Sequence, residues 1–89
     1  ALGQNYPNPF NPSTQIRYAL PEQSRVTITI YNMLGGKVRT LVNDFQDAGY
    51  RNVLWNATND HGSPVSAGMY IYTIQAGNFY QAKKMILLK

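Results

Sequence analysis

Apolar and polar residues alternate along most of the chain with the two-residue period of strands that bury one face. In the clearest case, Val26, Ile28 and Ile30 fall on one face, and the residues between them are threonines. Val53 and Trp55 share a face in the same way. The pattern predicts strands over 15–20, 25–31, 51–55, 68–76 and 79–88. Because the segment 68–76 is apolar on both faces, we expect it in the centre of its sheet.

Short turns separate these segments, and no stretch of ten residues has the apolar stripe of a helix. The Gly77-Asn78 pair is typical of a two-residue hairpin, because these residues tolerate positive φ. The segment from Thr40 to Phe45 fits a strand end, a loop or one helical turn. The spacing predicts an all-β fold, an antiparallel β-sandwich of about seven strands.

The opening of the chain has three prolines between Pro7 and Pro12. Each proline lacks an amide donor, so this stretch does not fit inside a sheet. We expect residues 1–13 to form an extended strap along the edge of the sandwich, with Tyr6 and Phe10 pointing inward. Residues 14–89 then form the sandwich of a single domain. The alternative is a proline-rich ligand for an aromatic-lined groove of another protein.

Composition excludes several classes of function. The chain has no cysteine, so it has no disulfides and no thiolate zinc site. Its net charge is +4, and residues 83–89 hold +3 of this charge. Because the excess lies in a tail and not along one face, we expect no nucleic-acid partner. No apolar run exceeds four residues, against the roughly 20 that a transmembrane helix needs, so we expect no transmembrane segment.

The residues that could support catalysis are scattered. His61 lies at a predicted loop tip, and the carboxylates of Glu22, Asp44, Asp47 and Asp60 lie in four separate turn regions. A serine triad or a glycosidase needs its acidic and basic groups together in one cleft. We therefore predict no catalytic residues and a protein that is not an enzyme.

The loop 56–62 has oxygen-bearing side chains at the short spacing of a calcium loop. Calcium prefers about six to eight oxygen ligands, with several carboxylates among them, and Asp60 is the only carboxylate here. We interpret Asn56, Asn59 and Asp60 as turn-stabilising residues, and we predict neither a metal nor a cofactor. Trp55 is interpreted as a core residue.

The tyrosines divide between core and surface. Tyr70 and Tyr72 share a face with Ile74, which places them in the core. Tyr31 and Tyr80 could lie on the surface, where sugars could stack on their rings. This leaves open an alternative function, a carbohydrate- or cell-surface-binding accessory module of a secreted enzyme.

Motifs at both ends of the chain resemble a known family. The proline–asparagine opening, the central Trp55 and the ending Lys-Met-x-Leu-Leu-Lys occur together in the type A C-terminal sorting domain of the type IX (Por) secretion system. The chain is also similar to the Ig-like domain of flagellar hook-capping proteins. The resemblance covers the whole chain, and its motif positions include Tyr6, Pro7, Asn8, Pro9, Phe10, Asn11, Pro12, Trp55, Gly62, Gly68 and Tyr70.

The resemblance implies an Ig-like sandwich at the C-terminal end of a larger secreted protein. Such a domain directs an N-terminal cargo domain of the same precursor from the periplasm across the outer membrane of Bacteroidota-like bacteria, for surface attachment or release. The implied partners are the type IX secretion machinery and its sortase-like peptidase. The residues expected to be recognised in the final strand are Lys84, Met85, Leu87, Leu88 and Lys89.

The chain departs from the family pattern after the tryptophan. Members often have Trp-Asp-Gly-x-Asp there, whereas this chain has Asn56, Ala57 and Asn59 at the corresponding positions. This departure disfavours a metal in the loop. A purely structural Ig-like spacer remains the further alternative to a sorting domain.

Overall fold

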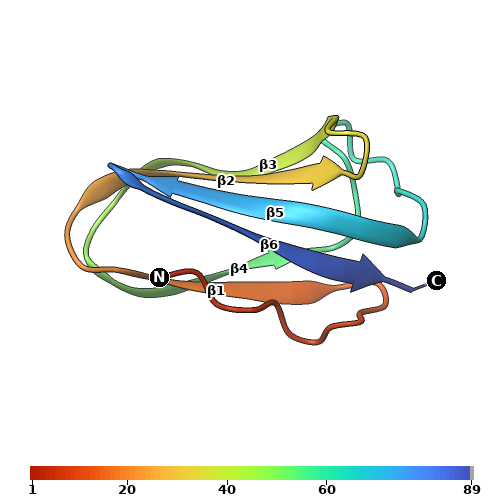
Figure 1. The fold of residues 1–89 in the computed structure, drawn as a ribbon, viewed down its shortest axis with the longest axis horizontal. Helices are drawn as coiled ribbons and strands as arrows, with labels where there is room; N and C mark the ends of the chain where they lie inside the picture. Colours follow the sequence, from red (N-terminus) through yellow and green to blue (C-terminus); the bar gives the residue numbers. More distant parts are fainter. Residues whose placement is uncertain (89) are drawn as a thin grey trace.

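The structure is a computed structural model that describes residues 1–88 and contains six strands (Figure 1). They are β1 (Thr14–Leu20), β2 (Ser24–Asn32), β3 (Lys37–Gln46), β4 (Gly49–Trp55), β5 (Gly68–Ala76) and β6 (Phe79–Leu87). The expectation of about seven strands was one too high for the described residues. The opening segment forms isolated bridges instead of a strand, and residues 56–67 form a loop closed by one bridge between Thr58 and Pro64.

The strands form two antiparallel sheets that lie one above the other (Figure 1). The larger sheet has the order β3-β2-β5-β6, and the smaller sheet pairs β1 with β4. The prediction that segment 68–76 lies centrally is confirmed, because β5 has β2 on one side and β6 on the other. β6 is therefore an edge strand of the larger sheet.

Alternation along the strands places one apolar face of each sheet in a shared core. Val26, Ile28 and Ile30 of β2 are fully buried, as the two-residue period predicts. Across the core, Ile16 of β1 and Trp55 at the end of β4 are also fully buried. The predicted core positions of Tyr70, Tyr72 and Ile74 on β5 are confirmed as well.

β3 is the strand that the sequence pattern did not resolve. It pairs with β2 from Ser24↔Gln46 to Tyr31↔Lys37, with register irregularities between Ile28 and Thr29 and again between Ile30 and Tyr31. Each irregularity interrupts the period of two, since an extra residue on one strand shifts the following side chains. The adjacent residues Leu41 and Val42 are both half-buried and pack against the core.

The hairpin between β5 and β6 has the predicted two-residue connection. Ala76 pairs with Phe79, and the connection consists of Gly77 and Asn78. Gly77 has a φ of +57°, a conformation that glycine adopts without a steric penalty. The hairpin places the final strand directly against β5 over its whole length.

The strap, residues 1–13, runs beside β1 and then reaches the end of β6 (Figure 1). Leu2 and Tyr6 form antiparallel bridges with Tyr18 and Gln15 of β1, and Phe10 forms a parallel bridge with Leu87 of β6. Phe10 points inward and is buried, as expected. The expectation for Tyr6 was wrong: its backbone is paired with Gln15, and its side chain is 77% exposed.

Two properties of the described residues bear on function. No helix in residues 1–88 is long and apolar enough to cross a membrane. Within the same residues, no group of three or more His, Cys, Asp or Glu side chains is placed to hold a metal ion.

Candidate functional site

The final strand divides the predicted recognition residues between two faces. Met85 and Leu87 point into the core and are fully buried. Lys84 and Leu88 are exposed, and so is Ile86, which the sequence prediction did not include. Its place between two core residues is the signal that could have identified it, since alternate residues of an edge strand face outward. Lys89 lies outside the described residues.

The strap occupies the outer edge of β6 near its C-terminal end. The amide of Phe10 donates to the carbonyl of Ile86 at 3.0 Å, and the amide of Leu88 donates to the carbonyl of Phe10 at 2.8 Å. The Asn8 side-chain oxygen accepts from the Ile86 amide at 3.0 Å, and the Gln4 side chain donates to the Lys84 carbonyl at 3.0 Å. The strap therefore already occupies these outward backbone groups of β6.

Buried polar contacts hold the strap in place. The Asn5 amide donates to the hydroxyl of Tyr72 at 2.8 Å, and this hydroxyl donates to the carbonyl of Gly3 at 2.9 Å. The Asn5 side chain also donates to the Thr14 hydroxyl at 3.0 Å, and that hydroxyl donates to the carbonyl of Pro7. Asn5 is only 2% exposed, so this closed set of hydrogen bonds is what permits its burial. No pattern of apolar residues in the sequence could have indicated this set of buried hydrogen bonds.

Phe10, Trp55 and Tyr70 are motif positions that meet in the core. The ring centroids of Phe10 and Trp55 are 5.8 Å apart, and those of Trp55 and Tyr70 are 5.4 Å apart. Such tilted and edge-to-face contacts are favourable arrangements of aromatic rings. The Tyr70 hydroxyl donates to the carbonyl of Ser66 at 2.6 Å. These three residues thus join the strap, the smaller sheet and the larger sheet.

The other motif positions lie outside the core. Gly62 and Gly68 have φ values of +83° and +148°, a region that side chains with a Cβ rarely adopt. The remaining motif residues Pro7, Asn8, Pro9, Asn11 and Pro12 are exposed. Of these, Asn8 binds the backbone of β6 as described above.

The loop after Trp55 uses its polar side chains to fix its own backbone. The Asn59 side-chain oxygen accepts from the amides of His61 and Ser63, both at 3.0 Å. An Asp60 oxygen accepts from the Thr40 amide of β3 at 3.0 Å. The Trp55 ring nitrogen donates to the Thr58 carbonyl at 2.9 Å. The contacts of Asn59 agree with its turn-stabilising interpretation, whereas the Asp60 side chain ties the loop to β3.

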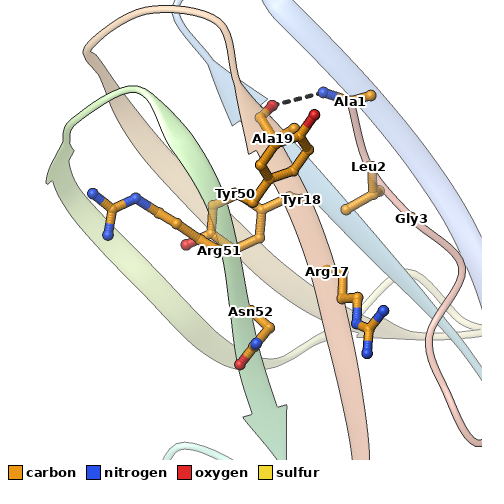
Figure 2. Close-up of a pocket in the computed structure, with 9 residues that line it drawn as sticks. All are labelled: Ala1, Leu2, Gly3, Arg17, Tyr18, Ala19, Tyr50, Arg51 and Asn52. Carbon is orange, nitrogen blue, oxygen red and sulfur yellow. Dashed lines mark hydrogen bonds between the residues drawn. The ribbon is translucent and has the colours of Figure 1, made fainter.

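A hollow of about 490 Å³ is lined by residues 1–3, by β1 and by β4, with residues 1–3 running beside β1 (Figure 2). Its lining consists of Ala1, Leu2, Gly3, Arg17, Tyr18, Ala19, Tyr50, Arg51 and Asn52. The Ala1 nitrogen donates to the Ala19 carbonyl at 2.7 Å, and the side chains of Arg17 and Arg51 point in different directions (Figure 2). No carboxylate or imidazole is among these lining residues.

Two tyrosine hydroxyls have perturbed ionisation. Burial raises the pKa of Tyr18, whose hydroxyl donates to the Gln46 side chain at 2.6 Å. Burial also raises the pKa of Tyr72, although the hydrogen bond from Asn5 opposes the shift. Both hydroxyls connect separate parts of the fold.

The tyrosines considered for sugar stacking differ in exposure, because Tyr80 is 60% exposed and Tyr31 is half-buried.

The fold and the site define a class of protein: a small two-sheet β-domain whose final strand is clasped by its own N-terminal strap. The chain belongs to the secretion system C-terminal sorting domain family, whose model matches residues 4–88. A domain of this family marks its protein for export across the outer membrane, to the cell surface or into the medium. The family predicted from the sequence motifs is confirmed. A comparison with curated proteins gives no significant match.

Solved structures share the fold. The chain is similar to dimeric latent PorU from Porphyromonas gingivalis, with a TM-score of 0.73, 21% identity and coverage of 96% of this chain and 9% of that one. It is similar to PorZ, an essential surface component of the type IX secretion system of the same organism, with a TM-score of 0.68 and 18% identity. That match covers 97% of this chain and 11% of PorZ. The chain thus spans about a tenth of each of these relatives.

A third similar structure is FlgD from P. aeruginosa. Its TM-score is 0.65 at 18% identity, and the match covers 85% of this chain and 64% of FlgD. At these levels of identity, the three structures establish a shared fold.

Proposed function

We propose that this chain is a non-catalytic sorting domain that directs a larger cargo protein across the outer membrane, for surface attachment or release. The observation that carries the proposal is the family match over residues 4–88. The cargo would precede this domain in the same precursor. The scattered carboxylates, and the lining of the hollow without a carboxylate or an imidazole, support a role without catalysis.

We further propose that residues 1–89 form one domain with an Ig-like sandwich, in which residues 1–13 are the strap and residues 14–89 the sandwich. The two facing antiparallel sheets support this description. The contacts from Asn5 and Phe10 to both sheets support treating the strap as part of the domain.

The proposed partners are the type IX machinery and its sortase-like peptidase. We propose that the machinery recognises the last strand through Lys84, Leu88 and Lys89. Met85 and Leu87 would contribute by fixing the strand in the core, since both side chains are fully buried. The exposed side chains of Lys84 and Leu88 support direct contact at these positions.

The proposal is tested with a fluorescent protein that carries an N-terminal Sec signal and residues 1–89 at its C-terminus, expressed in a bacterium with the type IX system. We expect the fusion to reach the surface or the medium. Fusions that lack residues 84–89, or that carry Lys84→Glu with Lys89→Glu, should stay in the periplasm.

The charge-reversed fusion is the decisive variant, because truncation also removes part of a core strand. Substitutions at an exposed site such as Lys84 usually change stability by less than about 0.5 kcal/mol, and a melting curve of the reversed domain checks that it is folded. Retention of the parent fusion in the periplasm would contradict the sorting function. Full export of a folded, charge-reversed fusion would contradict recognition through these lysines.

A further inference from the structure

Over residues 84–88, the accessible part of the final strand is a face and not an edge. The strap binds the outward backbone groups of Lys84, Ile86 and Leu88. A partner that added a strand there would first have to displace Asn8 and Phe10. The outward side chains of the same stretch need no such displacement, because Lys84 is exposed and Ile86 is 38% exposed.

These side chains belong to a row that crosses the whole larger sheet. Lys37 of β3 pairs with Tyr31 of β2, Tyr31 pairs with Ile71 of β5, and Ile71 pairs with Lys84 of β6. Paired residues of antiparallel strands place their side chains on the same face. The neighbours Ile30, Tyr72 and Met85 are buried in the core, so this row lies on the outer face.

A second, shorter row extends the apolar surface. Met69 of β5 pairs with Ile86 of β6, next to the first row, and the two side chains are 39% and 38% exposed. We call the two rows together the outer-face patch, which consists of Tyr31, Lys37, Met69, Ile71, Lys84 and Ile86. Its centre is apolar, and a lysine lies at each end of the longer row.

The charges of the outer-face patch have one sign. None of the four carboxylates of the chain, at positions 22, 44, 47 and 60, belongs to either row. The two lysines lie on the first and the last of four adjacent strands. Three interstrand spacings, or about 14 Å, therefore separate them. A complementary surface would therefore cover the apolar centre and place a carboxylate near each lysine.

We propose that the outer-face patch is the docking surface for a protein partner that presents an apolar segment flanked by carboxylates. The inference rests on the proposed sorting function and assigns the chemistry of its recognition site. It adds residues from β2, β3 and β5 to those of the final strand. Two lysines favour a protein partner over an anionic membrane, because lipid-binding clusters typically contain about four to eight basic residues.

The test uses the same export fusion with changes outside the final strand, on β3 and β5. Lys37→Glu reverses one flanking charge, and Met69→Asn makes the apolar centre polar. Each has a matched control on the outer face of the smaller sheet. Arg17→Glu makes the same change of charge at an exposed site, and Leu54→Asn makes a comparable polar change at a side chain that is 57% exposed.

We expect Lys37→Glu and Met69→Asn each to lower the exported fraction about tenfold, which corresponds to a loss of about 1.4 kcal/mol in binding free energy. The controls should stay within about twofold of the parent, as surface substitutions usually do. Lys37→Arg should retain export. Melting curves of all purified domains establish that they fold, and Lys37→Gln replaces Lys37→Glu if the reversal lowers the melting temperature.

The outcomes separate this inference from the sorting function. If the parent fusion is exported and folded Lys37→Glu and Met69→Asn fusions are exported as well as their controls, the docking surface is wrong and the sorting function stands. If the parent fusion is retained in the periplasm, both the sorting function and the docking surface are contradicted. Binding of the parent to anionic phospholipid vesicles that is lost in Lys37→Glu would overturn the protein partner in favour of a membrane surface.

Discussion

Trp55 shows how one side chain can connect several parts of a small domain. Its ring is fully buried between Phe10 of the strap and Tyr70 of β5, and its nitrogen binds the loop that follows β4. The sequence placed Trp55 in the core, because it shares a strand face with Val53. The partners of the ring come from positions 45 residues before and 15 residues after it, and the local pattern contains no information about them.

Replacing this side chain should be costly. We expect Trp55→Ala to lower the free energy of unfolding by about 3 to 5 kcal/mol, because the remaining core cannot fill so large a void. Denaturant unfolding of the isolated domain measures the change. Tyr50→Ala is a suitable control, since it removes an aromatic ring that is 94% exposed. A loss below about 1 kcal/mol for Trp55→Ala would show that the ring does not hold the core together.

At the scale of elements, β6 has two different halves. Its C-terminal half has its outward backbone groups bound by the strap, through Gln4, Asn8 and Phe10. Edge strands of native proteins are commonly covered or charged, which prevents pairing with other chains. Here the cover lies over residues 84–88, and the lysines of the same strand add charge.

Hydrogen exchange should distinguish the two halves of the strand. We expect the amides of Ile86 and Leu88 to exchange slowly, because both donate to the strap. The outward amides of Tyr80 and Ala82, for which the described residues offer no partner, should exchange faster. Amide-resolved exchange measured by NMR at neutral pH provides the comparison.

A substitution in the strap provides the control for this prediction. Asn8→Ala removes the acceptor for the Ile86 amide and should speed its exchange, whereas Asn11→Ala changes a nearby exposed asparagine and should not. Equal exchange rates for Ile86 in the two variants would contradict the assigned hydrogen bond.

At the scale of the whole molecule, the strand periodicity predicted more of the fold than of the site. The buried faces of β1, β2 and β5 follow from alternation, and the β5–β6 hairpin follows from Gly77 and Asn78. The conformation of the segment that forms β3 was not decided from the sequence, because the register irregularities interrupt the two-residue alternation of apolar and polar side chains. The outer-face patch was not foreseen, because the row from Lys37 to Lys84 exists only once four strands are in register.

Two neutral tyrosine hydroxyls join the layers of the molecule. Tyr18 of the smaller sheet binds Gln46 of the larger sheet, and Tyr72 of the larger sheet binds the strap. Burial raises the pKa of both groups above the ordinary value of 10.0. The unfolded chain therefore loses these protons at a lower pH than the folded domain does.

This difference predicts alkaline destabilisation. The stability linked to these hydroxyls is fully present below the unfolded pKa and is lost as the pH rises through the folded pKa, so unfolding should become easier between about pH 8 and pH 11. Urea unfolding at both pH values measures the loss. Tyr18→Phe has no hydroxyl to ionise at that position. The variant should therefore lose less free energy of unfolding between the two pH values than the parent does. An equal loss would exclude Tyr18 as a source of the pH dependence.

The hydrogen bonds between the strap and β6 also determine when the domain can complete its folding. Asn8 and Ile86 are 78 residues apart in the chain, yet they bind one another. Contacts at such sequence separation form late and slow the folding of a small domain, because a long loop must close first. A chain emerging from the ribosome could not bury Phe10 against its final partners until the last strand had been made. The hydrogen bonds between the strap and β6 can therefore form completely only after the chain has been synthesised through residue 88.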